Sequence, residues 1–164
     1  MALSKRWLNY YFGFASHAAN NSYAERDKVG AAAFKRGRII ATGYNGTCSG
    51  HSNICEDPLT GETLPVVAHA EINLLGQLAK STETTEGVAV FVTRRPCIKC
   101  AVALLAAGVS EIHCYDRGNR EGTSHLRKHA LVMVYDPYSL NLLYDILKPV
   151  TDIINPVDNN QRGQ

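Results

Sequence analysis

The sequence predicts an α/β sandwich built around one mixed sheet. Short apolar, β-branched segments alternate along the chain with longer segments whose apolar residues recur at three- and four-residue steps, which is the pattern of strands alternating with helices. Residues 29–34 and 38–43 are two such apolar segments, and only the turn-forming Lys35-Arg36-Gly37 separates them. They predict a β-hairpin, and therefore an antiparallel pair in the sheet. The 164 residues suffice for one sizeable core, so we expect a single domain over residues 1–164.

Each element has a local signal of its own. An aromatic stripe at helical spacing predicts a helix over residues 4–20, and we interpret the stripe as core packing. Residues 43–64 are rich in Gly, Ser, Asn, Thr and Pro and predict a long loop, a feature that is more often functional than passive. The remaining elements are expected to be helices over 66–81, 96–107, 121–130 and 138–147, and strands over 88–93, 112–115 and 131–135. The polar tail over 155–164 is expected to be flexible.

Composition narrows the function classes. With 45% hydrophobic and 20% charged residues, the chain resembles an ordinary globular protein. We find neither an apolar run near the ~20 residues of a membrane span nor a secretory leader, so we expect no membrane partner and a cytoplasmic location. A net charge of only +2 argues against a nucleic-acid partner. In such a chain, a C-x-x-C pair among five cysteines indicates metal or redox chemistry before it indicates a disulfide.

The sharpest signal is His69-Ala70-Glu71 followed by Pro96-Cys97 and Cys100, with Cys97 lying 28 residues after His69. We expect each half to lie at the start of a helix, where partial positive charge favours the thiolates that a metal needs. Cys97 and Cys100 are three residues apart, so both sulfurs would face the same way. One imidazole and two thiolates leave a fourth tetrahedral position for water, which is the pattern of a catalytic zinc. The sequence therefore predicts Zn²⁺ held by His69, Cys97 and Cys100.

Glu71 has the properties of a catalytic acid–base group. It lies two residues beyond His69, so it can reach a metal-bound water without ligating the metal. The combination H-x-E…P-C-x-x-C is the signature of zinc deaminases. Alone, C-x-x-C could be a redox pair, and H-x-E could be two polar side chains exposed to solvent. A structural zinc module would need a fourth ligand and would have no use for Glu71.

Further motifs carry a resemblance to a known family. They are W-L-N-Y-Y-F from Trp7, R-D-K-V-G-A from Arg26, G-Y-N-G from Gly43, H-A-E-I-N from His69, and the Cys100-Ala101 helix that ends in Ala107-Gly108-Val109. With them, the chain over roughly residues 7–135 resembles the deoxycytidylate (dCMP) deaminases of the cytidine deaminase superfamily. The resemblance implies a cytidine deaminase-like three-layer α/β/α sandwich with a mixed five-stranded sheet. It also implies hydrolysis of dCMP to dUMP and ammonia.

The resemblance implies regulation and assembly as well. Members of this family are commonly homohexamers, activated by dCTP with Mg²⁺ and inhibited by dTTP. The G-Y-N-G motif is associated with that regulator site, which makes Gly43, Tyr44, Asn45 and Gly46 candidate triphosphate contacts. In the wider superfamily, an Asn at the position of Asn45 also contacts the substrate sugar, and the sequence does not separate the two roles.

The candidate substrate residues are Arg26, Asn45, Ala70, Tyr115 and Arg117. Arg26 precedes the first strand and could bind a phosphate with both arms of its guanidinium; we favour this role over the alternative of a surface arginine. Tyr115 and Arg117 follow a strand, where α/β sheets place ligands, and Arg117 is a second phosphate candidate.

The chain also departs from the family pattern. Relatives usually carry an apolar residue at the position of Arg94, and often a tyrosine at the position of Gly118. These departures leave the precise substrate open, including modified cytosines. Some phage relatives hold a second zinc in the long loop. The spacing of Cys48, His51 and Cys55 resembles a ligand set, but we identify no fourth ligand, and buried or free thiols are the simpler interpretation.

Alternative functions remain open at this point. A related deaminase could act on dCTP, on a free cytosine nucleoside or on a tRNA adenosine. The low net charge and Asn45-Gly46 argue against tRNA, and the basic Arg26 and Arg117 argue against a free nucleoside. Outside the enzymes, a zinc-bearing interaction protein that kept the site for stability is the competing hypothesis.

Overall fold

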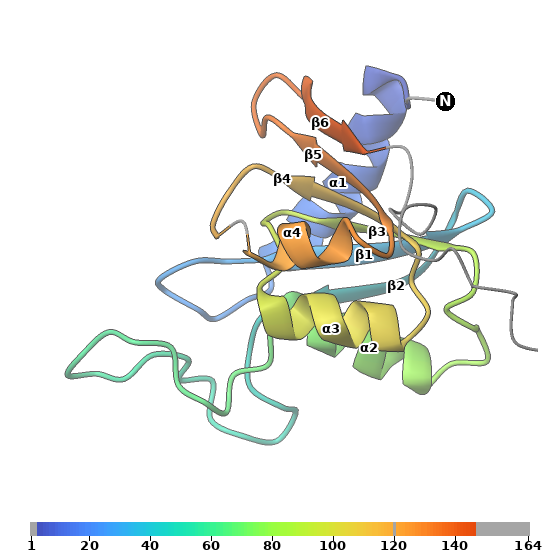
Figure 1. The fold of residues 1–164 in the computed structure, drawn as a ribbon. Coiled ribbons are helices and arrows are strands. Elements are labelled where there is room, and N and C mark those ends of the chain that lie inside the picture. The colour runs from blue at the N-terminus through green and yellow to red at the C-terminus, as the bar shows by residue number, and fades with distance from the viewer. Residues whose placement is uncertain (1–2, 120, 147–164) are drawn as a thin grey trace, which may run out of the picture.

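The computed structural model describes residues 3–119 and 121–146, and within them one six-stranded sheet forms the centre of the molecule (Figure 1). The strand order is β2-β1-β3-β4-β5-β6. The strands are β1 (Gly30–Lys35), β2 (Arg38–Tyr44), β3 (Val88–Val92), β4 (Glu111–Tyr115), β5 (Leu131–Tyr135) and β6 (Leu142–Ile146). β3, β4 and β5 are parallel, whereas β1 is antiparallel to both β2 and β3, and β6 is antiparallel to β5. The predicted hairpin and mixed sheet are confirmed.

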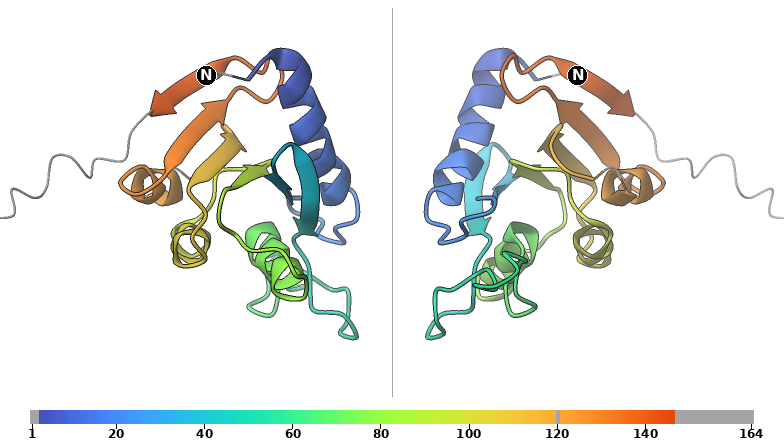
Figure 2. Two further views of the ribbon diagram at one scale, coloured as in Figure 1. Left: turned by 90° about the vertical axis from the view of Figure 1, so that its right-hand side faces the viewer. Right: turned by 90° about the vertical axis from the view of Figure 1, so that its left-hand side faces the viewer.

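Helices cover both faces of the sheet, so the predicted three-layer sandwich is confirmed (Figure 2). α1 (Lys5–Ala19) lies on one face; α2 (Ala70–Ala79), α3 (Ile98–Ala106) and α4 (Glu121–Leu126) lie on the other. Alternate residues of each strand face opposite layers. Ala31 and Ala33 join the core under α2 and α3, while Ala32 and Phe34 join the aromatic core under α1. Among the described helices, none is long and apolar enough to cross a bilayer.

Two glycines let helices approach the sheet closely. A Cβ at Gly30 would lie 2.6 Å from the backbone nitrogen of Ala19 in α1. A Cβ at Gly43 would lie 2.5 Å from the backbone nitrogen of Leu74 in α2. Only a residue without a side chain fits at either position. The glycines of V-G-A and G-Y-N-G therefore set the distance of α1 and α2 from the sheet.

The C-terminal element differs from its prediction. The helix expected over 138–147 is wrong for residues 142–146, which form β6, and the sheet therefore has six strands and not five. Residue 147 lies outside the described residues, as does the tail predicted over 155–164. The Asp136 side chain accepts hydrogen bonds from the backbone of Tyr138 and Ser139, which turns the chain back antiparallel to β5. The periodicity of a short apolar run does not distinguish a helix from a strand. Here the run forms a strand because it pairs with the edge of β5.

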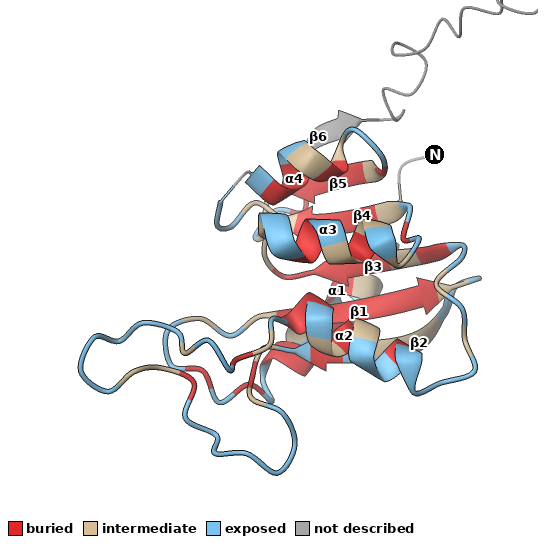
Figure 3. Cartoon of the chain, turned by 60° about the horizontal axis from the view of Figure 1, so that its bottom comes forward, coloured by how far each residue is buried: buried red, intermediate tan, exposed pale blue. Residues whose placement is uncertain are grey.

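Two helices begin later than predicted. α2 starts at Ala70 rather than at residue 66, and α3 starts at Ile98 rather than at residue 96. The long loop before α2 is confirmed, and it extends from the sandwich as a largely exposed segment (Figure 3). Cys55 and Val67 of this loop pack with Ala24 in a small separate core. The late helix starts place His69 and Cys97 in extended backbone, as the N-caps of α2 and α3.

Candidate active site

The N-termini of α2 and α3 bring three potential metal ligands together. His69 caps α2, Cys97 caps α3, and Cys100 lies in the first turn of α3. The Nδ1 atom of His69 is 3.5 Å from the Sγ of Cys97 and 3.4 Å from the Sγ of Cys100. Within the described residues, this is the one cluster of three or more His, Cys, Asp or Glu side chains whose ligand atoms lie close enough to share a metal ion. We refer to His69, Cys97 and Cys100 as the His–Cys–Cys group.

The geometry of the group fits zinc. Zn–N bonds of about 2.0–2.1 Å and Zn–S bonds of about 2.3 Å at the tetrahedral angle place nitrogen and sulfur about 3.6 Å apart. The two nitrogen–sulfur separations of 3.5 and 3.4 Å agree with that value. Two thiolates, which are soft donors, and one imidazole suit Zn²⁺, and three protein ligands leave one coordination position open. The donor set and the spacing therefore both support zinc.

Glu71 lies beside this group, in the first turn of α2, with only 4% of its surface exposed. Burial raises the pKa of the Glu71 carboxyl above its ordinary value. A buried carboxyl with a raised pKa exchanges protons more readily near neutral pH than an ordinary glutamate does.

A cavity of about 260 Å³ opens onto these groups. His69, Cys97 and Glu71 line it together with three of the predicted substrate residues, Arg26, Asn45 and Ala70. The cavity lies at the carboxyl ends of β3 and β4, where α/β sheets hold ligands. Segments that are far apart in the sequence therefore contribute to one pocket.

The other two predicted substrate residues lie elsewhere. Tyr115 does not line the cavity; its ring stacks on Phe12 of α1 at a centroid distance of 4.1 Å, on the opposite face of the sheet. Arg117 also lies outside the cavity lining, but its guanidinium donates a hydrogen bond of 2.7 Å to Asp27. Asp27 itself lines the cavity.

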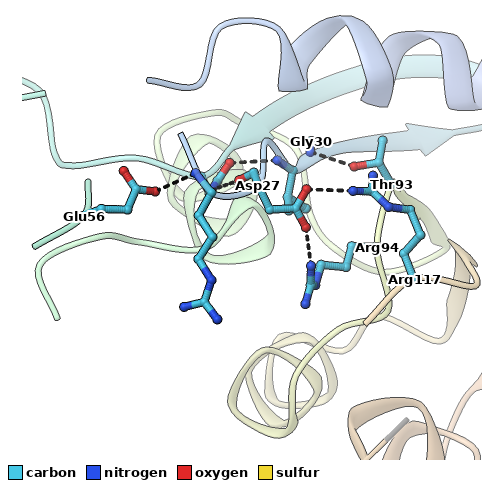
Figure 4. A network of polar contacts seen from close by, with 9 residues as sticks. Asp27, Gly30, Glu56, Thr93, Arg94 and Arg117 are labelled. Carbon is cyan, nitrogen blue, oxygen red and sulfur yellow. Dashed lines mark hydrogen bonds and ion pairs between the residues drawn. The ribbon is translucent and has the colours of Figure 1, made fainter. Parts of the chain in front are cut away.

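A network of polar contacts fixes the segment before β1, and we identified none of its carboxylates from the sequence (Figure 4). Asp27 accepts hydrogen bonds from both Arg94 and Arg117. The side chain of Asn45 holds the same segment, because it donates to the Asp27 carbonyl at 2.8 Å and accepts from the Val29 amide at 2.8 Å. Local spacing could not have identified these pairs, since Arg94 is 67 residues from Asp27.

A buried arginine joins the two loops that flank the His–Cys–Cys group. The side chain of Arg95 is 1% exposed and donates to Asp116 at 2.7 Å and to Thr123 at 3.0 Å. Next to Thr123, Gly122 of α4 packs directly against the backbone of Pro96 and Cys97. These contacts hold the N-terminus of α3, and with it Cys97, against the rest of the sandwich.

The G-Y-N-G motif is divided between two cavities. Gly43, Tyr44 and Gly46 line a second cavity of about 680 Å³, together with Asn73 and Lys80. Asn45 instead lines the first cavity, beside Glu71. The motif therefore contributes residues to the walls of both cavities.

The remaining cysteines do not form a second metal group within the described residues. Cys48 is exposed and Cys55 is buried, with its thiol 3.5 Å from the Asn53 carbonyl. Cys114 is buried in the core. His113 is fully buried between the rings of Phe91 and Tyr135.

Comparison with known proteins agrees with this geometry. The family model described as the cytidine and deoxycytidylate deaminase zinc-binding region matches residues 5–116. The deoxycytidylate deaminase of Mycobacterium phage D29 is 37% identical over 119 residues, covering 65% of this chain and 91% of the phage protein. The deoxycytidylate deaminase of Enterobacteria phage T4 is 27% identical, covering 70% of this chain and 81% of that protein.

A solved structure is similar as well. The dCMP deaminase of cyanophage S-TIM5, crystallised with dCMP and dUMP, superimposes with a TM-score of 0.77 at 34% identity, covering 81% of this chain and 99% of the cyanophage chain. The match of the family model includes the complete His–Cys–Cys group and Glu71. The chain therefore belongs to the cytidine and deoxycytidylate deaminase family of zinc-binding enzymes.

Proposed function

We propose that this protein is a zinc-dependent enzyme that hydrolyses dCMP to dUMP and ammonia. The observation that carries the proposal is a buried carboxyl, Glu71, in the same cavity as a His–Cys–Cys group with zinc-like spacing. Similarity to phage proteins named as dCMP deaminases supports the choice of substrate. The basic residue Arg26 on the cavity wall suits a nucleotide better than an uncharged nucleoside.

In this proposal, Glu71 moves the protons of the reaction. Zinc bound in the His–Cys–Cys group would supply Lewis acidity that makes water nucleophilic near neutral pH. Glu71 accepts the proton that the water loses and donates a proton to the ring nitrogen, as attack proceeds at C4 of cytosine. The carboxylate then takes the second proton of the attacking water from the new hydroxyl at C4 and gives it to the amine. The C4–N bond breaks to release ammonia and leave the C4 carbonyl of dUMP, so one side chain serves as base and then as acid.

The polar residues of the cavity would orient the nucleotide. Asn45 retains one amide hydrogen for the sugar after donating the other to the Asp27 carbonyl. Ala70 lies between His69 and Glu71 and lines the cavity, and it is proposed to contact the base. Arg26 and Arg117 would bind the 5′-phosphate. Tyr115, which packs under α1, would support this region and not touch the substrate.

Exchange of Glu71 for glutamine tests the chemical step. We expect Glu71→Gln to lower kcat for dCMP by about 10²–10⁴-fold, because general acid–base catalysis contributes that much. Zinc content should be unchanged, because Glu71 is not one of the ligands. Glu83→Gln, which alters a surface carboxylate paired with Lys35, is the matched control. Equal activity of wild type and Glu71→Gln would favour the alternative of a zinc-bearing interaction protein.

A substrate panel separates the remaining enzyme alternatives. Turnover should be measured with dCMP, dCTP, deoxycytidine, cytidine, a 5-modified dCMP and a tRNA anticodon stem. The proposal expects the highest kcat/KM for dCMP or its modified form. A preference for deoxycytidine or for the tRNA would overturn it.

We also propose that the second cavity binds a regulatory triphosphate, dCTP with Mg²⁺ or dTTP, in a homohexamer. The support is that Tyr44 and Gly46 of the G-Y-N-G motif line this cavity together with the cationic Lys80. Rate curves against dCMP should be sigmoidal and become hyperbolic with dCTP, and Lys80→Ala should weaken this response. Curves that stay hyperbolic with either triphosphate would refute regulation, and sedimentation would test the subunit count.

A further inference from the structure

Two arginines from different loops share one carboxylate next to the cavity. Arg94 follows β3 and Arg117 follows β4, and both donate to Asp27, which precedes β1 (Figure 4). The side chains of Arg94 and Arg117 are 42% and 44% exposed, whereas Glu71 is 4% exposed. Both arginines are therefore far more exposed to solvent than Glu71, and Arg94 lines the same cavity.

The position of Arg94 depends on a glycine. A Cβ at Gly118 would lie 2.6 Å from the Nε atom of Arg94 and 3.0 Å from its Cζ atom, so the guanidinium occupies the space that a side chain at residue 118 would fill. The backbone nitrogen of Arg95 donates to the Arg117 carbonyl at 2.8 Å, which joins the two arginine-bearing loops. Arg94 and Gly118 are the two departures noted from the family pattern, and the structure brings them into contact.

The charges around this end of the cavity favour an anion of low charge. Arg26, Arg94 and Arg117 contribute three positive charges. Asp27 and Glu56 contribute two negative charges, and the Glu56 carboxylate already accepts from the backbone of Glu25 and Arg26. Within residues 3–119 and 121–146, Arg94 and Arg117 each donate to Asp27 alone, and a guanidinium has five N–H donors. Donors therefore remain for a phosphate.

We propose that Arg94 is a specificity-determining residue that binds the 5′-phosphate of the nucleotide together with Arg117. Asp27 is the positioning residue that holds both guanidiniums at the required place. The reacting carbon of the base must lie near Glu71 and the His–Cys–Cys group, at the buried end of the cavity. The phosphate is the part of a nucleotide that reaches the exposed end, and paired guanidiniums match its oxygens. This inference rests on the proposed function for the identity of the nucleotide.

Comparison of a substrate that has the phosphate with one that lacks it tests the role of Arg94. Hydrogen bonds to charged groups contribute about 1.5–3 kcal/mol, so Arg94→Leu should lower kcat/KM for dCMP by about 10–150-fold. Its kcat/KM for deoxycytidine should stay within about twofold of wild type, because that substrate makes no phosphate contact. The kcat/KM of Arg94→Lys for dCMP should lie between those of the wild type and Arg94→Leu, because lysine keeps the charge and loses the planar fork of the guanidinium. Asp27→Asn should raise KM for dCMP without changing turnover of deoxycytidine.

Two controls exclude simpler explanations. Arg38→Leu removes the same charge at the far end of β2, where Arg38 pairs with Glu83, and it should leave both substrates unchanged. Inhibition by inorganic phosphate supplies a readout that does not need deoxycytidine turnover, and its inhibition constant should rise in Arg94→Leu and not in Arg38→Leu. If Arg94→Leu does not fold, the same comparisons with Arg94→Lys decide.

The outcomes separate the two proposals. Equal losses for dCMP and deoxycytidine, or no loss for either, would refute the phosphate role of Arg94 while leaving dCMP deamination intact. A wild-type enzyme that does not turn over dCMP would refute the proposed function. In that event, calorimetry of dCMP binding to the wild type, to Arg94→Leu and to Arg38→Leu still tests Arg94. Loss of binding specific to Arg94→Leu would support the inference, and unchanged binding would overturn it.

Discussion

Substitution of Gly122 by alanine tests how the second zinc-binding helix is positioned. Gly122 lies in α4 and packs against the backbone that carries Cys97. An added Cβ would lie 2.6 Å from both the carbonyl carbon and the carbonyl oxygen of Cys97, where ordinary contact begins near 3.4 Å. The Pro96 carbonyl oxygen would lie closer still, at 2.0 Å. The backbone of Pro96 and Cys97 must therefore separate from α4 by about 0.8–1.4 Å, the differences between these distances and 3.4 Å. Zinc sites tolerate ligand distances within about ±0.2 Å, so the shift exceeds what the metal accepts.

The expected effects of Gly122→Ala follow from this displacement. Overpacking should lower the free energy of unfolding by about 1–3 kcal/mol. Disturbing the support of a metal ligand should weaken zinc affinity by about 10–100-fold. A displacement near 1 Å in a catalytic site should lower kcat by about 100-fold. Chelator competition, urea denaturation and turnover of dCMP measure the three quantities separately.

Gly76→Ala provides the matched control. Gly76 lies in α2, the helix that carries Glu71, and no heavy atom lies within 4 Å of a Cβ at this position. Alanine is preferred to glycine in a helix interior, so this variant should gain about 0.5–1 kcal/mol of stability and bind zinc normally. If Gly122→Ala holds zinc as tightly as Gly76→Ala, then α4 does not position Cys97 and the reasoning is wrong.

Three further predictions concern the cysteines, a surface carboxylate and a second glycine. In the zinc-loaded protein, a thiol reagent should react quickly with the exposed Cys48 alone; chelation should add the half-buried Cys97, while Cys100 stays protected by burial. Cys55 and Cys114 should stay protected until unfolding, because burial raises the pKa of both and brings that of Cys114 to about 12. A hydrogen bond with the buried His113 lowers the pKa of the Glu111 carboxyl. The carboxylate therefore stabilises the fold above the unfolded-state pKa of about 4.3, and this stabilisation is lost as the pH falls through the lower folded-state pKa. The difference in unfolding free energy between wild type and Glu111→Gln should therefore shrink between pH 6 and pH 3, and a constant difference would contradict this assignment. Gly43→Ala should lose about 1–3 kcal/mol in urea denaturation, because its Cβ would lie 2.5 Å from the backbone of α2; an unchanged midpoint would show that the helix can move away.

The elements that could be predicted from the sequence are those with a long or punctuated pattern. The 15-residue α1 and the β1–β2 hairpin carry clear periodicity and a clear turn. The starts of α2 and α3 were displaced by two to four residues, because local propensity does not show where a helix must give way to an extended ligand-bearing residue. The run that forms β6 was assigned to a helix, since only the free edge of β5 determines that it pairs as a strand.

The sequence by itself determined the chemistry of the metal site. His69, Glu71, Cys97 and Cys100 are few, specific side chains at spacings set by helix geometry, and local spacing is what a sequence records directly. Only the tertiary structure decided which groups surround that site. It brought Asp27 to Arg94 across 67 residues, turned Asn45 into one cavity and Tyr44 toward another, and moved Tyr115 under α1. These contacts depend on strand order and on how closely helices approach the sheet, and neither is encoded within any single segment of the chain.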